Sequence, residues 1–323
     1  MAGKLIAPPP KKTRSGPRAG ASPSTDTPAE TRGPGPGPGR GQMFVTRFAP
    51  SPTGPLHLGH AYSAILAHDM ARAAGGRFLL RMEDTDLERC RPEYDALIQE
   101  DLHWLGLTWD GPIHRQSTHI TDYNTRLEAL EPLGLLYPCS CTRSDIRAAL
   151  AAPQEGVVHQ VYPGTCRGRP MSSRQPGDAL RLNLTAALTA LSGQDLAFIE
   201  TGPAHTGRHL VAPAQAQAQI GDVVLSRKGE DIVAYFLASA FDDADQGITH
   251  VIRGEDLFDF TAVQVILQHL FGLPTPIYHH HRLIRDDQGK RLAKRDDARA
   301  LSKYRAEGAT PADIRRMVGL PNP

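Results

Sequence analysis

The sequence predicts an α/β protein, a doubly wound domain whose two halves are separated by an irregular insertion. Three observations lead to this fold class. A short apolar strand, an amphipathic helix and a second strand follow one another over residues 44–82. Helices and a strand alternate again over residues 231–271. The segment between these two regions is irregular and holds few apolar residues in its middle part.

Each element of the first region has its own local signal. Phe44, Val45 and Phe48 predict the first strand. Residues 58–74 carry apolar side chains at helical spacing and end at a Gly-Gly pair, which predicts a helix. Residues 77–82 predict a second strand. Two strands joined by one helix form a right-handed parallel unit, so we expect ligands beyond the carboxyl ends of these strands.

Weaker signals predict the remaining elements. They are helices at 93–105 and 117–133, a hairpin around Lys228-Gly229, a helix at 231–240, a strand at 248–252 and a helix at 260–271.

Composition limits the class of protein. The 323 residues carry a formal net charge of +1, and no apolar run approaches bilayer length. The basic first residues lead into Pro8-Pro9-Pro10 rather than an apolar stretch, so no secretory signal is expected. Four cysteines do not make a disulfide framework in a chain this long, which favours a reducing, cytoplasmic location. Residues 1–42 are basic and rich in Pro and Gly, and we expect them to be a disordered extension.

Two histidines stand where the first helix is predicted to begin. His57 and His60 flank Gly59, directly after a Pro- and Gly-rich turn. The first N–H groups of a helix are unpaired and its dipole is positive there, so this end attracts anions. A site for the phosphates of a nucleotide is therefore predicted. Surface histidines, or half of a metal site, are the alternatives.

An acidic run follows the second strand. Glu83 opens the sequence Glu83-Asp84-Thr85-Asp86. A carboxylate placed beyond the strand end can hold an ammonium group. The alternative is a solvated acidic turn.

Three cysteines have the spacing of a metal site. Cys139 and Cys141 are two residues apart, and Cys166 follows downstream. Three thiolates leave a tetrahedral zinc site one ligand short. Unligated thiols are the alternative, but the intervening loop is too poor in apolar residues to fold unaided.

Several motifs resemble those of class I aminoacyl-tRNA synthetases. His57-Leu58-Gly59-His60 resembles the HIGH signature, with Leu in place of Ile, and the string from Arg47 through Gly54 is similar to the glutamyl/glutaminyl branch. Residues 231–238 and 249–256 are similar to strings in the second half of that family. Residues 290–295 resemble the KMSKS loop, with Arg291 and Ala293 replacing a Lys and the Ser. The cysteine spacing is similar to the zinc insertion of glutamyl-queuosine-tRNA(Asp) synthetases.

The resemblance implies a role for each matching residue. Glutamate would be bound by Arg47, Phe48, Ala49, Pro50, Ser51, Glu83, Tyr235 and Arg253. ATP, accompanied by Mg²⁺, would be bound by His57, Gly59, His60 and Lys294, of which His57, His60 and Lys294 are the expected catalytic residues. A structural Zn²⁺ would be held by Cys139, Cys141, Tyr162 and Cys166. By themselves, Tyr235 could be a core residue and Arg253 part of a surface ion pair.

The resemblance also implies an activity and a domain plan. We expect a split Rossmann-like catalytic domain that activates L-glutamate with ATP without tRNA and transfers it to queuosine at the wobble position of tRNA(Asp). Only residues 298–323 follow the KMSKS-like loop, so no anticodon-binding domain is expected, and we expect a monomer. The expected parts are 43–132 and 221–297 as the halves of the catalytic domain, 133–220 as the zinc-containing insertion and 298–323 as a short tail.

Three other functions remain open at this stage. A glutamyl-tRNA synthetase fragment that charges tRNA(Glu) would share every motif. A catalytically silent RNA-binding relative would keep the fold and lose the chemistry. A small-molecule nucleotidylyltransferase would share the H-x-G-H turn but not the strings in the second half.

Overall fold

A computed structural model describes residues 42–142, 144–146, 161–226, 233–285 and 299–322. Residues 1–41 of the expected N-terminal extension lie outside the described residues. The same holds for the turn of the hairpin predicted around Lys228-Gly229 and for the KMSKS-like loop with Lys294.

The first half of the fold is the predicted parallel unit. Three parallel strands stand in the order β1-β2-β3, namely β1 (Val45–Phe48), β2 (Arg77–Met82) and β3 (His114–Arg115). Helix α1 (Leu58–Ala73) connects β1 to β2 and ends before Gly75, whose φ of 61° suits glycine. Helix α2 (Pro92–Trp104) follows β2 and agrees with the predicted helix.

The second half is a four-stranded sheet in the order β7-β6-β10-β9. Its strands are β6 (Ala197–Glu200), β7 (Gly207–Leu210), β9 (His250–Gly254) and β10 (Ile277–His281). Strand β10 is parallel to both of its neighbours, whereas β6 and β7 are antiparallel. Helices α7 (Tyr235–Asp245) and α8 (Thr261–Leu270) pack against each other beside this sheet.

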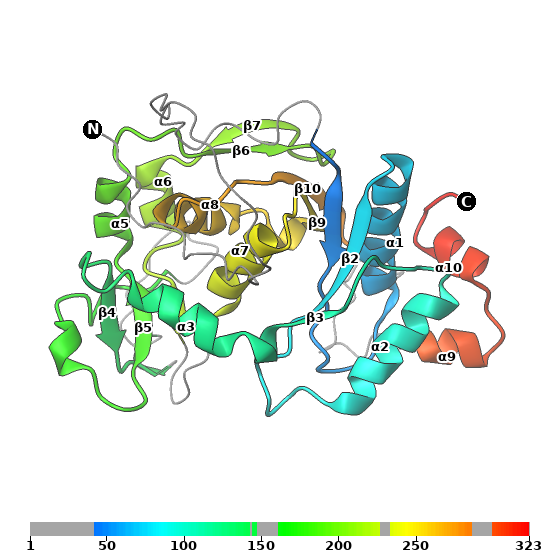
Figure 1. The fold of residues 1–323 in the computed structure, drawn as a ribbon, viewed down its shortest axis with the longest axis horizontal. Coiled ribbons are helices and arrows are strands. Elements are labelled where there is room, and N and C mark those ends of the chain that lie inside the picture. The colour runs from blue at the N-terminus through cyan, green and yellow to red at the C-terminus, as the bar shows by residue number, and fades with distance from the viewer. Residues whose placement is uncertain (1–41, 143, 147–160, 227–232, 286–298, 323) are drawn as a thin grey trace, which may run out of the picture.

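The two halves meet between β1 and β9, which lie side by side in Figure 1. Thr249 joins them, because its backbone N–H donates to the carbonyl of Val45 at 2.9 Å and its Oγ1 accepts from the Val45 N–H at 2.8 Å. The strands therefore continue from one half into the other, as a split doubly wound domain requires.

A third, antiparallel sheet combines two strands of the expected insertion with one strand that follows it. Its order is β4-β5-β8, with β4 (Leu136–Cys139), β5 (Ala179–Leu182) and β8 (Val224–Ser226). Helices α5 (Leu184–Ala190) and α6 (Pro213–Gln219) pack against each other. Ser226 and Val233 pair antiparallel on either side of the predicted hairpin turn.

Three predicted boundaries were wrong. The helix predicted over 117–133 is only α3 (Ile120–Glu128), because Ser117 is held by Asp84 in a 3₁₀ turn that precedes it. The helix predicted over 231–240 begins at Tyr235 and runs to Asp245 as α7. The strand predicted over 248–252 is shifted to His250–Gly254, since Thr249 serves the junction with β1.

The C-terminal segment folds onto the first half. Helices α9 (Leu301–Ala306) and α10 (Pro311–Met317) pack on α2 and α1, respectively. Leu301 and Ile314 are fully buried there. What was expected to be a short tail is thus, over 299–322, part of the hydrophobic core of this half.

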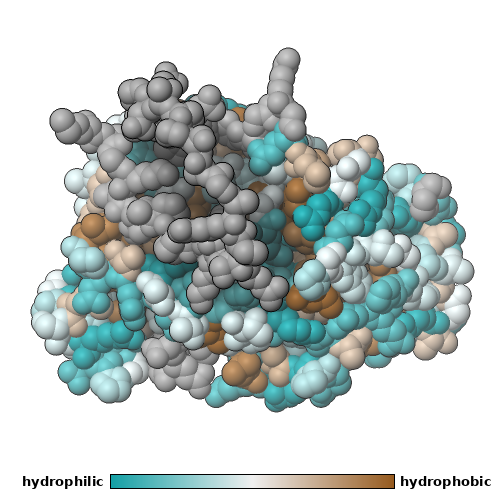
Figure 2. All heavy atoms as spheres, in the orientation of Figure 1, coloured by the Kyte–Doolittle hydropathy of each residue, from teal (hydrophilic) through white to brown (hydrophobic). Residues whose placement is uncertain are grey.

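Among the described residues visible in Figure 2, hydrophobic residues are scattered among hydrophilic ones. In the part of the chain that the structure covers, no helix combines the length and apolarity that crossing a bilayer needs.

Candidate active site

The carboxyl ends of β1 and β2 form the floor of the site. The Glu83 N–H donates to the carbonyl of Pro50 at 3.0 Å, so the segments that leave the two strands remain joined. Phe48 and Pro50 are buried, whereas Ala49 and Ser51 keep partial exposure. The structure therefore brings the predicted residues 48–51 beside Glu83, where ligands of parallel sheets bind.

The two signature histidines cap α1. His57 is the N-cap residue, and its Nδ1 accepts the Gly59 N–H at 3.1 Å. The His57 N–H in turn donates to Nδ1 of His60 at 3.2 Å, and the ring centroids are 3.8 Å apart. Because each Nδ1 accepts, each neutral ring carries its proton on Nε2. Two imidazole N–H donors thus accompany the positive end of the helix dipole.

Gly59 favours this arrangement. A Cβ at this position would lie 3.0 Å from Cε1 of His57 and 3.1 Å from its Nδ1. The His57 ring would then have to shift by a few tenths of an ångström. The glycine that the sequence pattern singled out has a direct packing reason.

The chain that follows the KMSKS-like loop returns to this helix end. Ala300 pairs antiparallel with His57, and the Leu301 N–H donates to the carbonyl of Leu56 at 2.8 Å. Lys294 itself lies outside the described residues.

A buried ion-pair cluster lies behind the predicted glutamate site. Asp243 of α7 accepts from Nε of Arg47 and from Nη1 of Arg81, each at 2.8 Å. Its neighbour Asp242 accepts from His114, Gln116 and Tyr123. Burial alone would raise the pKa of Asp243, but the charges of the two arginines hold it below its ordinary value.

Sequence reasoning missed Arg81, Asp242 and Asp243. Their signal was present, because two adjacent carboxylates follow an otherwise apolar stretch of the helix from Phe236 to Phe241. Carboxylates that interrupt the buried face of a helix need cationic or hydrogen-bonding partners. Arg81, alternating with apolar residues on a buried strand, was the available cation.

The negative charge of Glu83 is less closely paired than that of Asp243. Its nearest cation is Nη2 of Arg81 at 3.6 Å, which is longer than a hydrogen bond. Burial raises the pKa of Glu83 to about 7, and the positive charges of Arg81 and Arg47 offset this only in part. A second cation placed against this carboxylate would be stabilised by it.

Tyr235 and Arg253 approach the same cluster from the second half. The pKa of Tyr235 is raised by burial and then by the charge of Glu83, while Arg253 and Arg47 act in the opposite direction. Arg253 is 6% exposed on β9. Glu83, Arg47 and Arg253 thus each lie within electrostatic reach of Tyr235, although Arg47 and Arg253 are more than 200 residues apart in sequence.

The four predicted metal ligands also come together. The three Sγ atoms of Cys139, Cys141 and Cys166 lie within 4.8 Å of one another. The Tyr162 hydroxyl is 3.4 Å from Sγ of Cys139 and 3.5 Å from Sγ of Cys141. A tetrahedral site with Zn–S bonds of about 2.3 Å separates its sulfurs by about 3.8 Å, so this donor set suits zinc. Tyr162 and Tyr235 both line a cavity of about 370 Å³.

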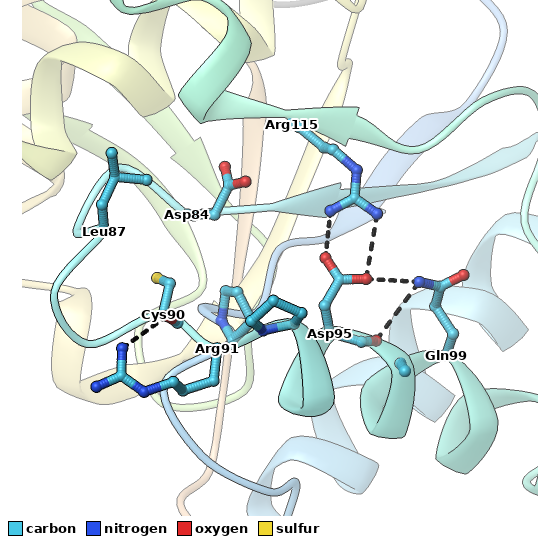
Figure 3. A pocket seen from close by; sticks show the side chains of 10 residues that line it. Asp84, Leu87, Cys90, Arg91, Asp95, Gln99 and Arg115 are labelled. Carbon is cyan, nitrogen blue, oxygen red and sulfur yellow. Dashed lines mark hydrogen bonds and ion pairs between the residues drawn. The ribbon is translucent and has the colours of Figure 1, made fainter.

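Another cavity, of about 390 Å³, lies beside the β2 end and the start of α2 (Figure 3). Asp95 forms an ion pair with Arg115 there, and Asp84 accepts from the N–H and the hydroxyl of Ser117. Free Cys90 also lines it. None of the predicted site residues that the structure describes lines this cavity, although Pro52 and Asp84 directly follow Ser51 and Glu83 in the chain.

Comparisons with known proteins agree with this geometry. The family model "tRNA synthetases class I (E and Q), catalytic domain" matches residues 43–172 and 208–321. A glutamyl-Q tRNA(Asp) synthetase from Rhodobacter capsulatus is 59% identical over 283 residues, 85% of this chain and 100% of that protein. One from Nitratidesulfovibrio vulgaris is 40% identical, with 84% of each chain covered.

The fold is also similar to a solved structure. A glutamate tRNA ligase from Elizabethkingia meningosepticum, crystallised with its amino acid, superposes with a TM-score of 0.67 and 27% identity. The match covers 86% of this chain and 60% of that one. By its motifs, its fold and these relatives, the chain belongs to the glutamyl-Q tRNA(Asp) synthetase family of class I (E and Q) tRNA synthetases.

Proposed function

We propose that this enzyme activates L-glutamate with ATP in the absence of tRNA and transfers it to the queuosine base of tRNA(Asp). Two observations support the proposal: Glu83, Arg47 and Arg253 all lie within electrostatic reach of Tyr235, and the helix that follows β1 begins with two histidines at its N-terminus. An amino acid with an extra carboxylate and a nucleotide with its phosphates are the ligands that these groups complement.

Two charged groups of glutamate are recognised, the α-ammonium group and the side-chain carboxylate. The Glu83 carboxylate, raised in pKa and weakly paired, takes the α-ammonium group. Arg47, Arg253 and the Tyr235 hydroxyl take the side-chain carboxylate, with residues 48–51 forming the wall around the substrate. Glutamine would leave these guanidinium groups poorly paired, and a polar site penalises such a mismatch strongly.

The phosphates of ATP lie against the start of α1. His57 and His60 supply imidazole donors, and Gly59 lets the phosphates approach the backbone. Lys294 completes the cradle. Lys294 lies six positions before Ala300, which pairs with His57, so the chain between them can span at most about 20 Å. Mg²⁺ accompanies the triphosphate and neutralises part of its charge.

The chemistry has two steps. The α-carboxylate of glutamate attacks the α-phosphorus of ATP in line, pyrophosphate leaves, and glutamyl-adenylate forms. A hydroxyl of the cyclopentenediol of queuosine then attacks the glutamyl carbonyl and releases AMP. Charge accumulates on the phosphate oxygens in the first step, so fixed donors such as the two imidazoles lower its barrier.

The zinc-binding insertion has a structural role in this proposal. Cys139, Cys141, Tyr162 and Cys166 hold one Zn²⁺, which stabilises a segment with few apolar residues of its own. The expected division into 43–132, 133–220 and 221–297 does not coincide with the sheets, because β6 and β7 pair in the sheet of the second half and β8 pairs with β5 of the insertion.

Pyrophosphate exchange tests the first step. Purified protein with glutamate, ATP, Mg²⁺ and labelled pyrophosphate should form labelled ATP without any tRNA. Glutamine in place of glutamate should give little exchange. If exchange appears only after tRNA(Glu) is added, the proposal fails and the protein acts as a glutamyl-tRNA synthetase. The likeness to a glutamate tRNA ligase makes that the second candidate.

A further inference from the structure

The guanidinium of Arg253 is held by neutral groups on three sides. Its Nε donates to Nε2 of His280 at 2.9 Å. Its Nη1 donates to Gln264 at 2.5 Å, and its Nη2 donates to Thr261 at 2.9 Å. Among the residues that the structure describes, no carboxylate forms an ion pair with Arg253, in contrast to Arg47 and its partner Asp243.

His280 connects Arg253 to the carboxylate of Glu200 through two hydrogen bonds. Because its Nε2 accepts from Arg253, the ring proton must reside on Nδ1. That Nδ1–H faces Oε2 of Glu200, with which it forms a short hydrogen bond. The imidazole is therefore neutral and is fixed in one tautomer by its two partners. Burial lowers the pKa of His280 from its ordinary value, more than the hydrogen bond to Glu200 raises it.

Glu200 is built to remain ionised in the core. It is 1% exposed, and its Oε1 accepts the backbone N–H of His280 at 2.9 Å and that of Gly202 at 2.5 Å. A Cβ at residue 202 would lie 2.7 Å from Oε1, so glycine is needed for the backbone to come this close. Although burial opposes ionisation, these hydrogen bonds lower the pKa of Glu200 to about 2.

The three side chains cross the second sheet from strand to strand. Glu200 ends β6, His280 lies on β10, and Arg253 lies directly opposite His280 on β9. His280 is packed between the rings of Tyr278 and Phe258, whose centroids lie 5.9 and 5.3 Å away. The row therefore has little freedom to rearrange.

From this geometry we propose that Glu200 and His280 are positioning residues for Arg253. They orient the guanidinium and balance its charge through the imidazole, so that no carboxylate of the protein occupies the direct ion-pair position. That position is kept for the side-chain carboxylate of the substrate. A direct Asp or Glu partner would also fix Arg253 but would neutralise its charge, as Asp243 does for Arg47, so Arg253 is the stronger cation for the substrate's carboxylate. The inference rests on the proposed function, since it assumes that Arg253 binds glutamate.

Two substitutions of His280 test its hydrogen bond to Arg253 and its hydrogen bond to Glu200 separately. In His280→Asn the amide nitrogen takes the place of Nδ1 and can still face Glu200, but the acceptor for Arg253 is lost. In His280→Gln the amide oxygen takes the place of Nε2 and can still accept from Arg253, but the donor to Glu200 is lost. Glu200→Gln removes the charge and keeps the size. His269→Gln is the matched control, because His269 is also buried and contacts Gln194 rather than Arg253.

The readouts are the KM for glutamate, the KM for ATP and the preference for glutamate over glutamine in pyrophosphate exchange. We expect His280→Asn and Glu200→Gln to raise the KM for glutamate by roughly tenfold to a hundredfold, the loss typical of a hydrogen bond to a charged group. The glutamate preference should fall, and the KM for ATP and the control should stay near wild type. His280→Gln should show a smaller effect than His280→Asn.

Other results of these measurements would overturn the inference. Variants that are less stable but keep the wild-type KM and preference would overturn the inference, since that is what a purely structural network predicts. If wild type activates no glutamate, the proposed function falls and the inference with it. A second measurement needs no variant: ¹⁵N spectra of the wild-type His280 ring should show a neutral imidazole protonated on Nδ1. A proton on Nε2, or on both nitrogens, would contradict the arrangement.

Discussion

Replacing Glu83 by glutamine should stabilise the ligand-free protein at alkaline pH while it abolishes glutamate binding. The carboxyl has 11% of its side chain exposed and its nearest cation, Arg81, 3.6 Å away, and burial raises its pKa to about 7. Holding the charged form in the fold therefore costs free energy, which the substrate's ammonium group would offset.

The size of this cost follows from the pKa. A rise from 4.5 to about 7 corresponds to about 3 kcal/mol, at 1.36 kcal/mol for each pKa unit. Since the folded-state pKa of an acid is raised, the cost is absent below pH 4.5, grows between pH 4.5 and about 7, and is complete above pH 7. Glutamine is uncharged, like the protonated carboxyl, so the variant does not bear this free-energy cost at any pH.

Thermal unfolding at two pH values measures the effect. At about pH 8.5 we expect the Glu83→Gln variant to unfold several degrees above wild type, since 1 kcal/mol shifts the Tm of a domain of this size by about 2 °C or more. At about pH 4.5 the two proteins should unfold together. Glu88→Gln is the matched control, because Glu88 belongs to the same segment and is exposed.

Two results would contradict this reasoning about Glu83. If the stability difference between Glu83→Gln and wild type is the same at both pH values, the charge of Glu83 is not the cause. If the variant still binds glutamate with wild-type affinity, the ammonium group is held elsewhere.

Three further predictions concern other parts of the molecule. His57→Asn and His60→Asn keep an acceptor at the Nδ1 position but lose the Nε2 donor. The kcat for pyrophosphate exchange should therefore fall by about 10²–10³-fold, while the Tm of each variant stays unchanged. Cys166→Ser should lose the bound zinc and unfold at a lower temperature, which metal analysis and calorimetry of the purified proteins will show together. Asp101 is buried against α9 with 3.7 Å to Arg305, and burial raises its pKa to about 6. Asp101→Asn should therefore stabilise the protein above pH 6 and leave its stability unchanged near pH 4, as urea titrations at the two pH values can establish.

Local pattern predicted the first half of the fold well. The strands at Val45–Phe48 and Arg77–Met82 and the helix between them are specified by nearby residues, including the glycine at 75 that ends the helix. Helix α10 could also have been predicted, because Thr310, Pro311 and Asp313 form a capping box with proline at the first helical position.

Other elements depend on contacts that are distant in sequence. Strand β10 contains three consecutive histidines, which do not have the apolar pattern of a buried strand. His280 is buried because Glu200, 80 residues away, supplies its partner, and His281 is buried against Ser63 of α1, whereas His279 stays partly exposed. The alternation of Ala and Gln in Pro213–Gln219 suggests no helical period, yet this segment forms α6 with Ala216 buried.

The candidate site shows the same division. Motifs pointed to His57, Glu83, Tyr235 and Arg253, and the structure brings Glu83, Arg253 and Arg47 within electrostatic reach of Tyr235. The residues that orient them lie outside these motifs, since Asp243 reaches Arg47 across 196 positions of sequence. The two adjacent carboxylates of α7 indicate that buried partners are needed, but only the fold determines which arginines these are.

The site of glutamate attachment tests the central claim most directly. Labelled glutamate, ATP and the enzyme are incubated with tRNA(Asp) that carries queuosine, and the product is digested into its 3′-terminal and anticodon fragments. Our account predicts label in the anticodon fragment, and none when the same tRNA lacks queuosine. Label at the 3′ end, or equal labelling of both forms of the tRNA, would contradict it.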